Sequence, residues 1–411
     1  MILVNLIKSG VLILDKKVVI LGNGFDLSCG LKSRYSDFFC KRINKELATC
    51  LNRTFNDFKR SFENDNFGYR MIFKIGTYKK NKFSEDFYIC NKTTYDKIRG
   101  NKLTFWDLVF YFFGNDSNDL QWQQIEQRML DFLNTPEDLN EIPSLDVISS
   151  ALKSNTFIGT NIKTLFCLHL AYYLPSGDKV YDQAELMNYL HTELRSFEKS
   201  FSEYIKSVES DEYRRKAGSL LLKMSNATSV PKIEDVVVFS FNYTNPFKVY
   251  NEKLSVVNVH GTVEDDNIIF GIDQERIDPN LDIFRFTKTF RQMTETKLAA
   301  KYDQEILPSK VTEIAFYGHS LSSLDYSYFQ TIFDYYDLYG SKILLVFYYK
   351  VYEGTTKEVI ELDLADKISK LLYNYSESID NVKRGKNLLH KLLLEKRLLI
   401  KEIEDNKSVY L

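Results

Sequence analysis

Residues 16–30 read KKVVILGNGFDLSCG, and this stretch decides the fold that we expect. The apolar run Val18–Leu21 is typical of a strand buried on both faces of a parallel sheet. It leads directly into a turn with glycine at two of three positions, followed by residues that suit the start of a helix. In this context, backbone N–H groups at the start of the helix can contact a phosphate. We therefore predict a nucleotide-binding loop that consists of Gly22, Asn23, Gly24, Phe25 and Asp26.

The glycine spacing departs from the two common nucleotide-binding loops. A third glycine stands at Gly30, whereas the GxGxxG pattern of a dinucleotide loop would place it at Leu27. The Gly-Lys-Ser/Thr ending of a P-loop does not follow either. The structural alternative is an ordinary strand-to-helix turn that needs glycine for a positive φ.

Later apolar runs predict the remaining strands of one α/β sheet. They are Val236–Phe241, Val256–His260, Glu313–Tyr317 and Ile343–Phe347, with Ile268–Phe270 as a weaker candidate. Between the first strand and Val236–Phe241, residues 36 to about 231 read mostly as helix and loop. Two stretches there carry apolar residues at helical spacing: Gln121–Asn134 and Glu185–Ser207.

This pattern divides the chain into four parts. We expect the first strand and glycine loop in residues 1–40, a mostly helical insertion in 41–231, the rest of the α/β core in 232–350, and C-terminal helices in 351–411. Within these parts we expect terminal helices at Asp363–Tyr373 and Asn387–Ile403, a long surface loop or hairpin at Asn66–Gly100, and a short hairpin or upstream extension at residues 1–16.

Composition narrows the class of protein. The chain has 411 residues, with 54 Lys and Arg against 56 Asp and Glu, a net charge of −2 that does not favour nucleic acid as a partner. Its five cysteines include no CxxC pair, so neither a metal site nor a disulfide framework is indicated, and a reducing cytoplasm fits best. No stretch approaches the roughly 20 apolar residues of a membrane span, so we expect a soluble protein without a membrane partner.

Two polar residues follow the predicted strands of the second half. Asn242 directly follows the run VFSF, and His260 directly follows the run VNV. The carboxyl ends of parallel strands form the ligand crevice of an open α/β sheet. Asn can orient a ribose, an amide or a water without carrying charge, and His can act as a general base near neutral pH. We expect both residues to be catalytic, whereas a buried packing histidine is the alternative for His260.

Several motifs together resemble the AbiH abortive-infection proteins. They are GNGFDL at 22–27, GLKSRYSDF at 30–38, WQQIE at 122–126, SFNYTN at 240–245, His260-Gly261, and GHSL at 318–321 with Asp325. The resemblance runs from residue 18 to about 332 in the order of the family. It implies a bacterial protein that limits phage infection, typically by disabling or killing the infected cell.

The order of these motifs is also similar to that of the sirtuin-like fold, a Rossmann-like parallel sheet. The glycine pair Gly24 and Gly30 keeps the sirtuin spacing, and Asn242 and His260 occupy the positions that handle the nicotinamide ribose of NAD. This resemblance implies NAD as ligand or substrate, hydrolysis of NAD in phage defence, and Ser320 and Asp325 on the ribose side of the crevice. Thr244 replaces the sirtuin Asp, Asp26 replaces a Ser, and a zinc-binding cysteine quartet is missing, so protein deacetylation is not implied.

Alternatives remain open at this point. A non-catalytic nucleotide sensor or interaction module could use the same crevice. Gly318-His319-Ser320 resembles the turn of a serine hydrolase, although Ser322 stands where that motif needs glycine and the later histidine, His390, lies in a leucine-rich helical pattern.

The roles of other residues are also undecided. Trp122 reads as a packing anchor, and Glu126 as either a cleft residue or a solvated one. The aromatic clusters in 54–113 and 326–352 read as core, with a surface for self-association or for a partner protein as the alternative. Because unregulated NAD hydrolysis would harm the host, a phage-derived trigger, a partner or assembly is expected.

Overall fold

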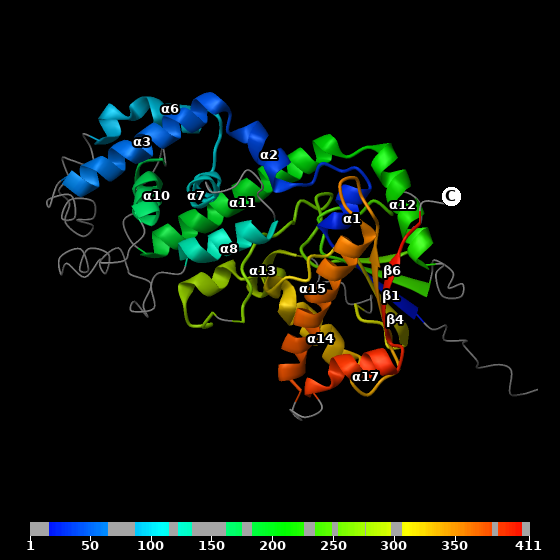
Figure 1. The fold of residues 1–411 in the computed structure, drawn as a ribbon. Coiled ribbons are helices and arrows are strands. Elements are labelled where there is room, and N and C mark those ends of the chain that lie inside the picture. The colour runs from blue at the N-terminus through cyan, green and yellow to red at the C-terminus, as the bar shows by residue number, and fades with distance from the viewer. Residues whose placement is uncertain are drawn as a thin grey trace, which may run out of the picture. The chain divides into compact units, whose positions relative to one another are not determined.

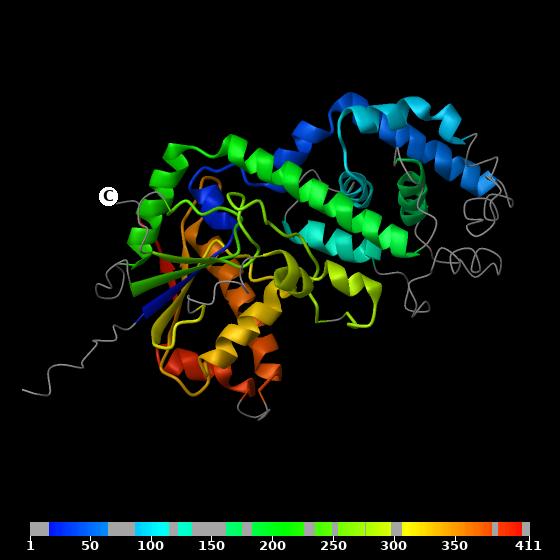
Figure 2. The same ribbon diagram turned by 180° about the vertical axis from the view of Figure 1, so that it is seen from behind.

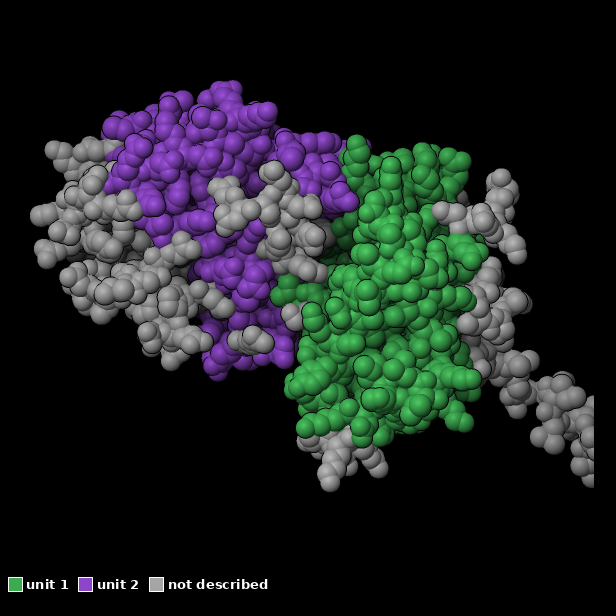
Figure 3. Space-filling view, in the orientation of Figure 1, with its two compact units in different colours: residues 1–32, 208–267, 296–411 green, residues 33–207, 268–295 purple. Residues whose placement is uncertain are grey.

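The computed structural model describes residues 16–64, 87–114, 122–133, 162–174, 183–225, 235–248, 254–275, 277–296, 306–379 and 385–404. The chain divides into two compact units, which are coloured separately in Figure 3. Unit 1 comprises residues 1–32, 208–267 and 296–411, and unit 2 comprises residues 33–207 and 268–295. Figures 1 and 2 show the elements of each unit from opposite sides.

Unit 1 is an α/β unit whose described residues form one all-parallel sheet with the strand order β3-β2-β1-β4-β5-β6. The order reverses between β1 and β4, as it does in Rossmann-like sheets. The strands are β1 (Lys16–Leu21), β2 (Val236–Ser240), β3 (Ser255–Asn258), β4 (Val311–Tyr317), β5 (Leu344–Tyr349) and β6 (Leu398–Glu402).

Helices cover both faces of this sheet (Figures 1 and 2). On one face, alternate strand residues such as Ile20, Phe239 and Phe316 pack against α14 (Tyr326–Tyr335), α15 (Lys357–Glu377) and α17 (Leu388–Leu394). On the other face lies α12 (Asp211–Ser225), where the carbonyl of Met224 accepts a hydrogen bond from Lys17 Nζ at 2.7 Å. Because both faces are covered, the central strands are mostly apolar, as the sequence pattern indicates.

A buried ion pair sets the register between the two central strands. Lys17 of β1 pairs in register with Glu313 of β4, and Lys17 Nζ lies 2.5 Å from Glu313 Oε1. Both side chains are buried, and burial lowers the pKa of Lys17 although Glu313 opposes this shift. A shift of one residue along either strand would leave two unpaired charges inside the sheet, so this pair disfavours other registers.

Unit 2 is helical in its described residues. Around the rings of Tyr35 and Phe38 pack Phe110, Phe197 and Phe201, which form a buried aromatic core. The helices are α2 (Tyr35–Arg42), α3 (Lys45–Asn64), α6 (Lys92–Gly100), α7 (Phe105–Phe113), α8 (Trp122–Leu133), α10 (Ile162–Tyr173), α11 (Gln183–Val208) and α13 (Lys288–Glu295), with the 3-10 turn η3 (Asp282–Phe286).

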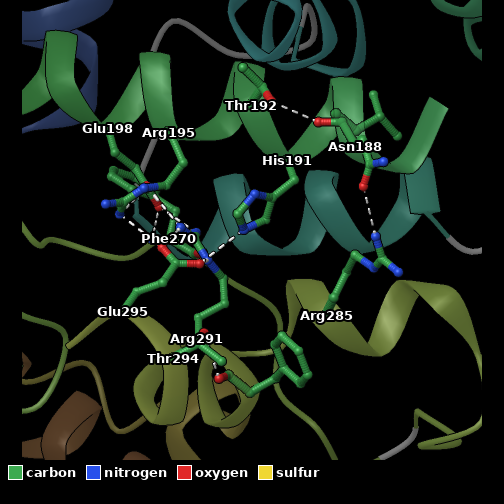
Figure 4. A network of polar contacts seen from close by, with 12 residues as sticks. Asn188, His191, Thr192, Arg195, Glu198, Phe270, Arg285, Arg291, Thr294 and Glu295 are labelled. Atoms are coloured by element: carbon green, nitrogen blue, oxygen red, sulfur yellow. Dashed lines mark hydrogen bonds and ion pairs between the residues drawn. The ribbon is translucent and has the colours of Figure 1, made fainter. Parts of the chain in front are cut away.

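A buried charge network joins α11 to α13 (Figure 4). The guanidinium of Arg291, which is fully buried, contacts Glu198 on α11, Glu295 on α13 and the carbonyl of Phe270, the last at 2.6 Å. His191 Nε2 lies 2.9 Å from Glu295 Oε1. Although burial opposes it, the hydrogen bonds from His191 and Arg291 lower the pKa of Glu295 to about 2. The network therefore holds its charges inside unit 2 by pairing them.

Most of the expected elements are confirmed. All five main strands are present, and the helices predicted at Gln121–Asn134, Glu185–Ser207 and Asp363–Tyr373 appear as α8, α11 and α15. The prediction for residues 1–16 lies outside the described residues, except that Lys16 begins β1.

Other expectations were wrong. Ile268–Phe270 is not a strand; it lies in unit 2, where the N–H of Phe270 donates to Glu198 Oε1 at 2.7 Å. Residues 87–100 are helical rather than a loop, while 65–86 lie outside the described residues. The predicted helix Asn387–Ile403 breaks at Lys396, which has a φ of 55°, and Leu398–Glu402 becomes β6 instead of helix.

The boundaries of the units also differ from the four expected parts. The helix α12 belongs to the sheet unit, whereas residues 33–40 and 268–295 belong to the helical unit. The last part, 351–411, contributes a strand to the sheet as well as helices. Periodicity does not reveal these differences, because packing between distant segments decides them.

We predict that Arg291→Met destabilises unit 2 by about 3–5 kcal/mol, because it removes the fully buried cation that pairs with Glu198 and Glu295. Both tryptophans of the chain, Trp106 and Trp122, lie in unit 2, so tryptophan fluorescence during urea unfolding reports on this unit. The matched control is Arg285→Met, which removes a partly exposed contact with Asn188 at 3.3 Å and should cost at most about 1 kcal/mol. Equal effects of the two substitutions would contradict the prediction.

Candidate functional site

The candidate site lies at the carboxyl ends of the central strands of unit 1. Because β1, β2, β3 and β4 are parallel neighbours, the segments that follow them emerge at one edge of the sheet. These segments carry Gly22–Asp26, Asn242, His260 and Gly318–Ser320, so the topology brings the separate sequence motifs to the same edge. In open α/β sheets, ligands bind at this edge near the point where the strand order reverses.

Gly22 and Gly24 allow two backbones to touch. A Cβ on Gly24 would lie 2.7 Å from the Cα of Gly318, and a Cβ on Gly22 would lie 2.5 Å from the Cα of His319. The N–H of Gly24 donates to the carbonyl of Gly318 at 2.8 Å, and that of Gly22 to the carbonyl of Tyr317 at 3.1 Å. The close approach that these glycines permit is therefore between the loops after β1 and β4, and their amides are committed to protein carbonyls.

A short helix follows the glycine turn and points two residues inward. This helix, α1 (Asn23–Ser28), buries Phe25 and Asp26 and leaves Asn23 half-buried. The ring of Phe25 packs against those of Phe247 and Tyr317, with centroids 5.9 and 6.1 Å apart. The predicted binding residue Phe25 thus lies in the core of unit 1.

Asp26 lies at the centre of a buried hydrogen-bond cluster. Its Oδ1 accepts from Tyr213 Oη at 2.8 Å, and its Oδ2 accepts from Thr244 Oγ1 at 2.9 Å. Tyr213 Oη and Thr244 Oγ1 are themselves 2.9 Å apart. The side chain of Asn242 also hydrogen-bonds to Asp26. All four side chains are at most 5% exposed, so the cluster has little access to bulk water.

Burial raises the pKa of Asp26 to about 7, although the hydrogen bonds from Tyr213, Thr244 and Asn242 oppose the shift. The charged form of a carboxyl group loses its hydration when it is buried, so the neutral acid is favoured. The pKa of Tyr213 is raised well above its usual value, first by burial and then by the charge of Asp26. Groups whose pKa is moved toward neutrality gather at functional sites, which makes Asp26 a functional candidate beyond its predicted role as a binding residue.

Asn242 has one buried atom without a hydrogen-bond partner. Its backbone is held on both sides: the N–H donates to Ser240 Oγ at 3.2 Å, and the carbonyl accepts from Asn258 Nδ2 at 2.9 Å. Its side-chain Oδ1, however, has no hydrogen-bond partner among the described residues. Because buried polar atoms are normally paired, this oxygen is available to a donor that a ligand or a water would supply.

His260 lies among aromatic rings at the neighbouring strand end. Its ring is 5.6 Å from those of Phe241 and Tyr328 and 6.3 Å from that of Tyr243, and the side chain is buried. The structure therefore places Asn242 in the polar cluster of Asp26 and His260 in an aromatic group around Phe241. This aromatic packing is what the alternative of a packing histidine predicts for His260.

The loop after β4 contains the remaining predicted residues. His319 Nδ1 accepts from the N–H of Leu321 at 3.0 Å, and its Nε2 lies 3.5 Å from Asp325 Oδ2. The His319 ring also packs on Phe241, with a centroid distance of 4.5 Å. Asp325 thus lies beside a histidine that orders the loop, and Ser320 is half-buried in the same loop.

The serine-hydrolase alternative finds no support in the position of His390. Its neighbour Lys391 places Nζ 5.2 Å from the centroid of the Tyr339 ring, just before the amino end of β5. Ser320 follows the carboxyl end of β4. The two residues of the proposed pair therefore lie at opposite ends of the sheet.

Sequence reasoning missed Tyr213 and left Glu126 undecided. Tyr213 lies on α12 in a pattern that reads as ordinary helix packing, and its partner Asp26 is 187 residues away, so no local signal reveals the contact. Glu126 forms an ion pair with buried Lys288, with Glu126 Oε1 2.8 Å from Lys288 Nζ. It is therefore a structural partner within unit 2.

An open hollow of about 520 Å³ lies at the other end of the sheet. It is lined by residues at the amino ends of β4 and β5 and at the end of α14, including Lys310, Tyr335 and Lys342. Because Asp26 and Asn242 follow the carboxyl ends of their strands, this hollow is separate from the candidate site.

The described residues thus define a Rossmann-like α/β protein with a buried polar cluster at the carboxyl ends of its central strands. Residues 18–349 match the family described as Bacteriophage abortive infection AbiH, and the chain therefore belongs to this family, whose members act in phage defence. Comparison with curated proteins and with solved structures finds no match. Within the described ranges, no helix combines the length and apolar character that a membrane crossing requires.

We predict that Gly24→Ala lowers the free energy of unfolding by about 2–3 kcal/mol, because its methyl group would overlap the backbone of Gly318. Gly100→Ala is the matched control, since a Cβ there would meet nothing within 4 Å. Urea unfolding followed by circular dichroism measures both variants. A Gly24→Ala protein as stable as wild type would show that the two loops can separate without cost.

We also predict that Asp26 makes stability depend on pH. Its pKa rises from an ordinary value of 3.8 to about 7 on folding, so between these values the folded state holds a proton that the unfolded state has lost. The resulting stabilisation is complete below about pH 4 and disappears as the pH rises through 7. Relative to Asp26→Asn, the wild type should therefore lose about 1.4 kcal/mol per pH unit between about pH 5 and 6, with a smaller slope near pH 7, where the folded acid itself ionises.

Hydrogen exchange of the β2 amides at a series of pH values checks this difference. The comparison with Asp26→Asn cancels the titration of other groups, which both proteins share. A difference that stays constant across this range would mean that Asp26 does not titrate there.

Proposed function

We propose that this AbiH protein binds a nucleotide, with NAD as the first candidate, at the carboxyl edge of its sheet, and that it disables the infected cell by hydrolysing that nucleotide. The observation that carries the proposal is the buried Oδ1 of Asn242, which lacks a hydrogen-bond partner among the described residues at an edge where α/β sheets bind ligands. The similarity of the motif order to sirtuin-like proteins supports NAD as the ligand.

In this proposal Asn242 accepts a hydrogen bond from a ribose hydroxyl or from the attacking water. The bond between the ribose carbon and the nicotinamide nitrogen breaks, and nicotinamide leaves with the bonding electrons as a neutral molecule. The water oxygen forms the new bond to the ribose carbon, and His260 accepts the proton that the water releases. Ser320 and Asp325 are proposed to contact the ribose from the loop after β4.

A second candidate function is a non-catalytic nucleotide sensor or interaction module. The aromatic packing of His260 favours it, because a buried ring held by Phe241 and Tyr328 suits a structural role. In either case we propose that a phage-derived trigger, a partner protein or assembly into oligomers controls the activity.

Release of nicotinamide from NAD by the purified protein distinguishes the two functions. We expect Asn242→Ala and His260→Ala to lower the rate by at least about 100-fold, since each removes a group that acts on the reacting atoms. The matched control is His390→Ala, because His390 is exposed at the opposite end of the sheet. Ser320→Ala tests the hydrolase alternative: loss of a ribose contact should weaken substrate binding, whereas loss of a nucleophile would abolish the reaction.

Phage plating on cells that carry the same variants links the reaction to defence. The proposal expects protection to be lost with Asn242→Ala and with His260→Ala while circular dichroism shows intact folding. If both variants still protect, hydrolysis is not the basis of defence. If only Asn242→Ala fails and no nicotinamide is released by any protein, the sensor function is favoured.

A further inference from the structure

Asp26, Tyr213 and Thr244 form a closed triangle of short contacts. The three oxygen-to-oxygen distances are 2.8 Å for Tyr213 to Asp26, 2.9 Å for Thr244 to Asp26, and 2.9 Å for Tyr213 to Thr244. Each distance is that of a hydrogen bond, so a fully bonded triangle needs three hydrogens.

The two hydroxyl groups supply only two of these hydrogens. If Asp26 is ionised, Tyr213 and Thr244 each donate to it, and their own oxygens then face each other at 2.9 Å with no hydrogen between them. If Asp26 is a carboxylic acid, its hydrogen is the third, and every contact in the triangle becomes a hydrogen bond. Because hydroxyl hydrogens rotate, the ring closes in either direction.

We propose that Asp26 rests as a neutral carboxylic acid in a closed ring of hydrogen bonds with Tyr213 and Thr244, and that this ring positions the amide of Asn242 with its Oδ1 presented to a hydroxyl group of the ligand. The last clause rests on the nucleotide site proposed above. The ring itself is a property of the protein without ligand.

The ring orients the amide of Asn242 because it keeps the acid hydrogen of Asp26 away from that amide. When that hydrogen is committed to Tyr213 or Thr244, the carboxyl group offers Asn242 only lone pairs, so the amide must turn its Nδ2 toward Asp26. Oδ1 then points away from the acid, which agrees with its lack of a partner among the described residues. The site consequently presents an acceptor, which suits the O–H donors of a ribose.

The charged and titratable groups around Asp26 favour the neutral acid. Burial raises its pKa, and the nearby carboxylate of Glu209 raises it further. The thiol of Cys29 on the same turn has a pKa raised to about 12, so it stays neutral beside Asp26. Lys216 and Lys350 act on the pKa of Cys29, whereas the main influences on the pKa of Asp26 are burial, its hydrogen-bond partners and Glu209.

This role differs from that of a general base, which must be ionised to accept a proton. The substitution Asp26→Asn distinguishes a positioning acid from a general base. An amide N–H can replace the acid hydrogen in the ring, whereas an amide cannot accept a proton as a base does. A positioning acid therefore survives this substitution, and a general base loses roughly 100-fold or more in rate. Asp26→Ala and Thr244→Val remove the ring in both cases.

Infrared spectroscopy of the full chain without ligand tests the neutral acid directly. At pH 6 the wild type should show a carboxylic-acid carbonyl band that is missing from Asp26→Asn and that fades as the pH rises. Asp131→Asn, which changes an exposed carboxylate on α8, is the matched control and should leave the band unchanged. A wild type without this band at pH 6 would overturn the proposal.

Nuclear magnetic resonance of the Asn242 side-chain amide tests the positioning, again without ligand. Selective labelling of Asn, with assignment through Asn242→Asp, follows its Nδ2 hydrogens. We expect slow exchange with solvent in the wild type and in Asp26→Asn, and at least about tenfold faster exchange in Asp26→Ala and Thr244→Val, which matches the loss of one net hydrogen bond. If Asp26→Asn exchanges as fast as Asp26→Ala, the ring does not position the amide.

Binding of NAD to the same variants by calorimetry connects the ring to the proposed site. Asp26→Asn should keep the affinity within about threefold, and Thr244→Val should lose about tenfold. If the wild type binds no NAD, the proposed function fails while the two measurements without ligand still decide the state of the ring. If Asp26→Asn loses hydrolysis as strongly as Asp26→Ala, Asp26 acts as a base, and if it loses binding as strongly, the ring does not position the amide. Either result overturns the inference.

Discussion

The structure of unit 1 depends on the contact between the loops that follow β1 and β4. Gly22, Gly24 and Gly318 leave no side chain between these loops, so backbone meets backbone at the point where the strand order reverses. The contact fixes the direction in which α1 leaves the sheet, and α1 in turn carries Asp26 into the interior. A larger residue in either loop would therefore displace the acid together with the turn.

Buried charge in this chain is stabilised by two kinds of chemistry. In unit 2, Arg291 is paired with two glutamates and Lys288 with Glu126, and in unit 1 Lys17 is paired with Glu313, so each of these buried cations has an opposite charge. Asp26 in unit 1 has hydroxyl and amide partners instead, and neutralisation by a proton takes the place of a cation. Paired charges change little near neutral pH, whereas an acid with a pKa of about 7 responds to it. Ion pairs therefore suit structural support, whereas an acid that can change its protonation state suits a functional site.

Asn242 and His260 have similar positions in the sequence motifs but different surroundings in the structure. Asn242 and His260 end neighbouring strands, but the first joins the polar cluster and the second joins the aromatic group of Phe241. Family membership assigns the chain to abortive infection, and the chemistry of the Asp26 cluster offers the route from that membership to a reaction. The proposed function and the proposed ring are tested by different measurements and can fail separately.

The sequence by itself determined five of the six described strands, the helices α8, α11 and α15, and the family. Apolar runs such as Val18–Leu21 and Val236–Phe241 have the pattern of strands covered on both faces, and such local patterns survive in any fold that buries them. It also identified the loop that contains Asp26 and the strand ends that contain Asn242 and His260. Only the tertiary structure decided that Gly24 leaves room for the backbone of Gly318 and that Leu398–Glu402 is a strand. It also decided that Tyr213 hydrogen-bonds to Asp26. These features depend on contacts between segments far apart in the chain, and burial and hydrogen bonding at such contacts leave no periodic signal in the residues that make them.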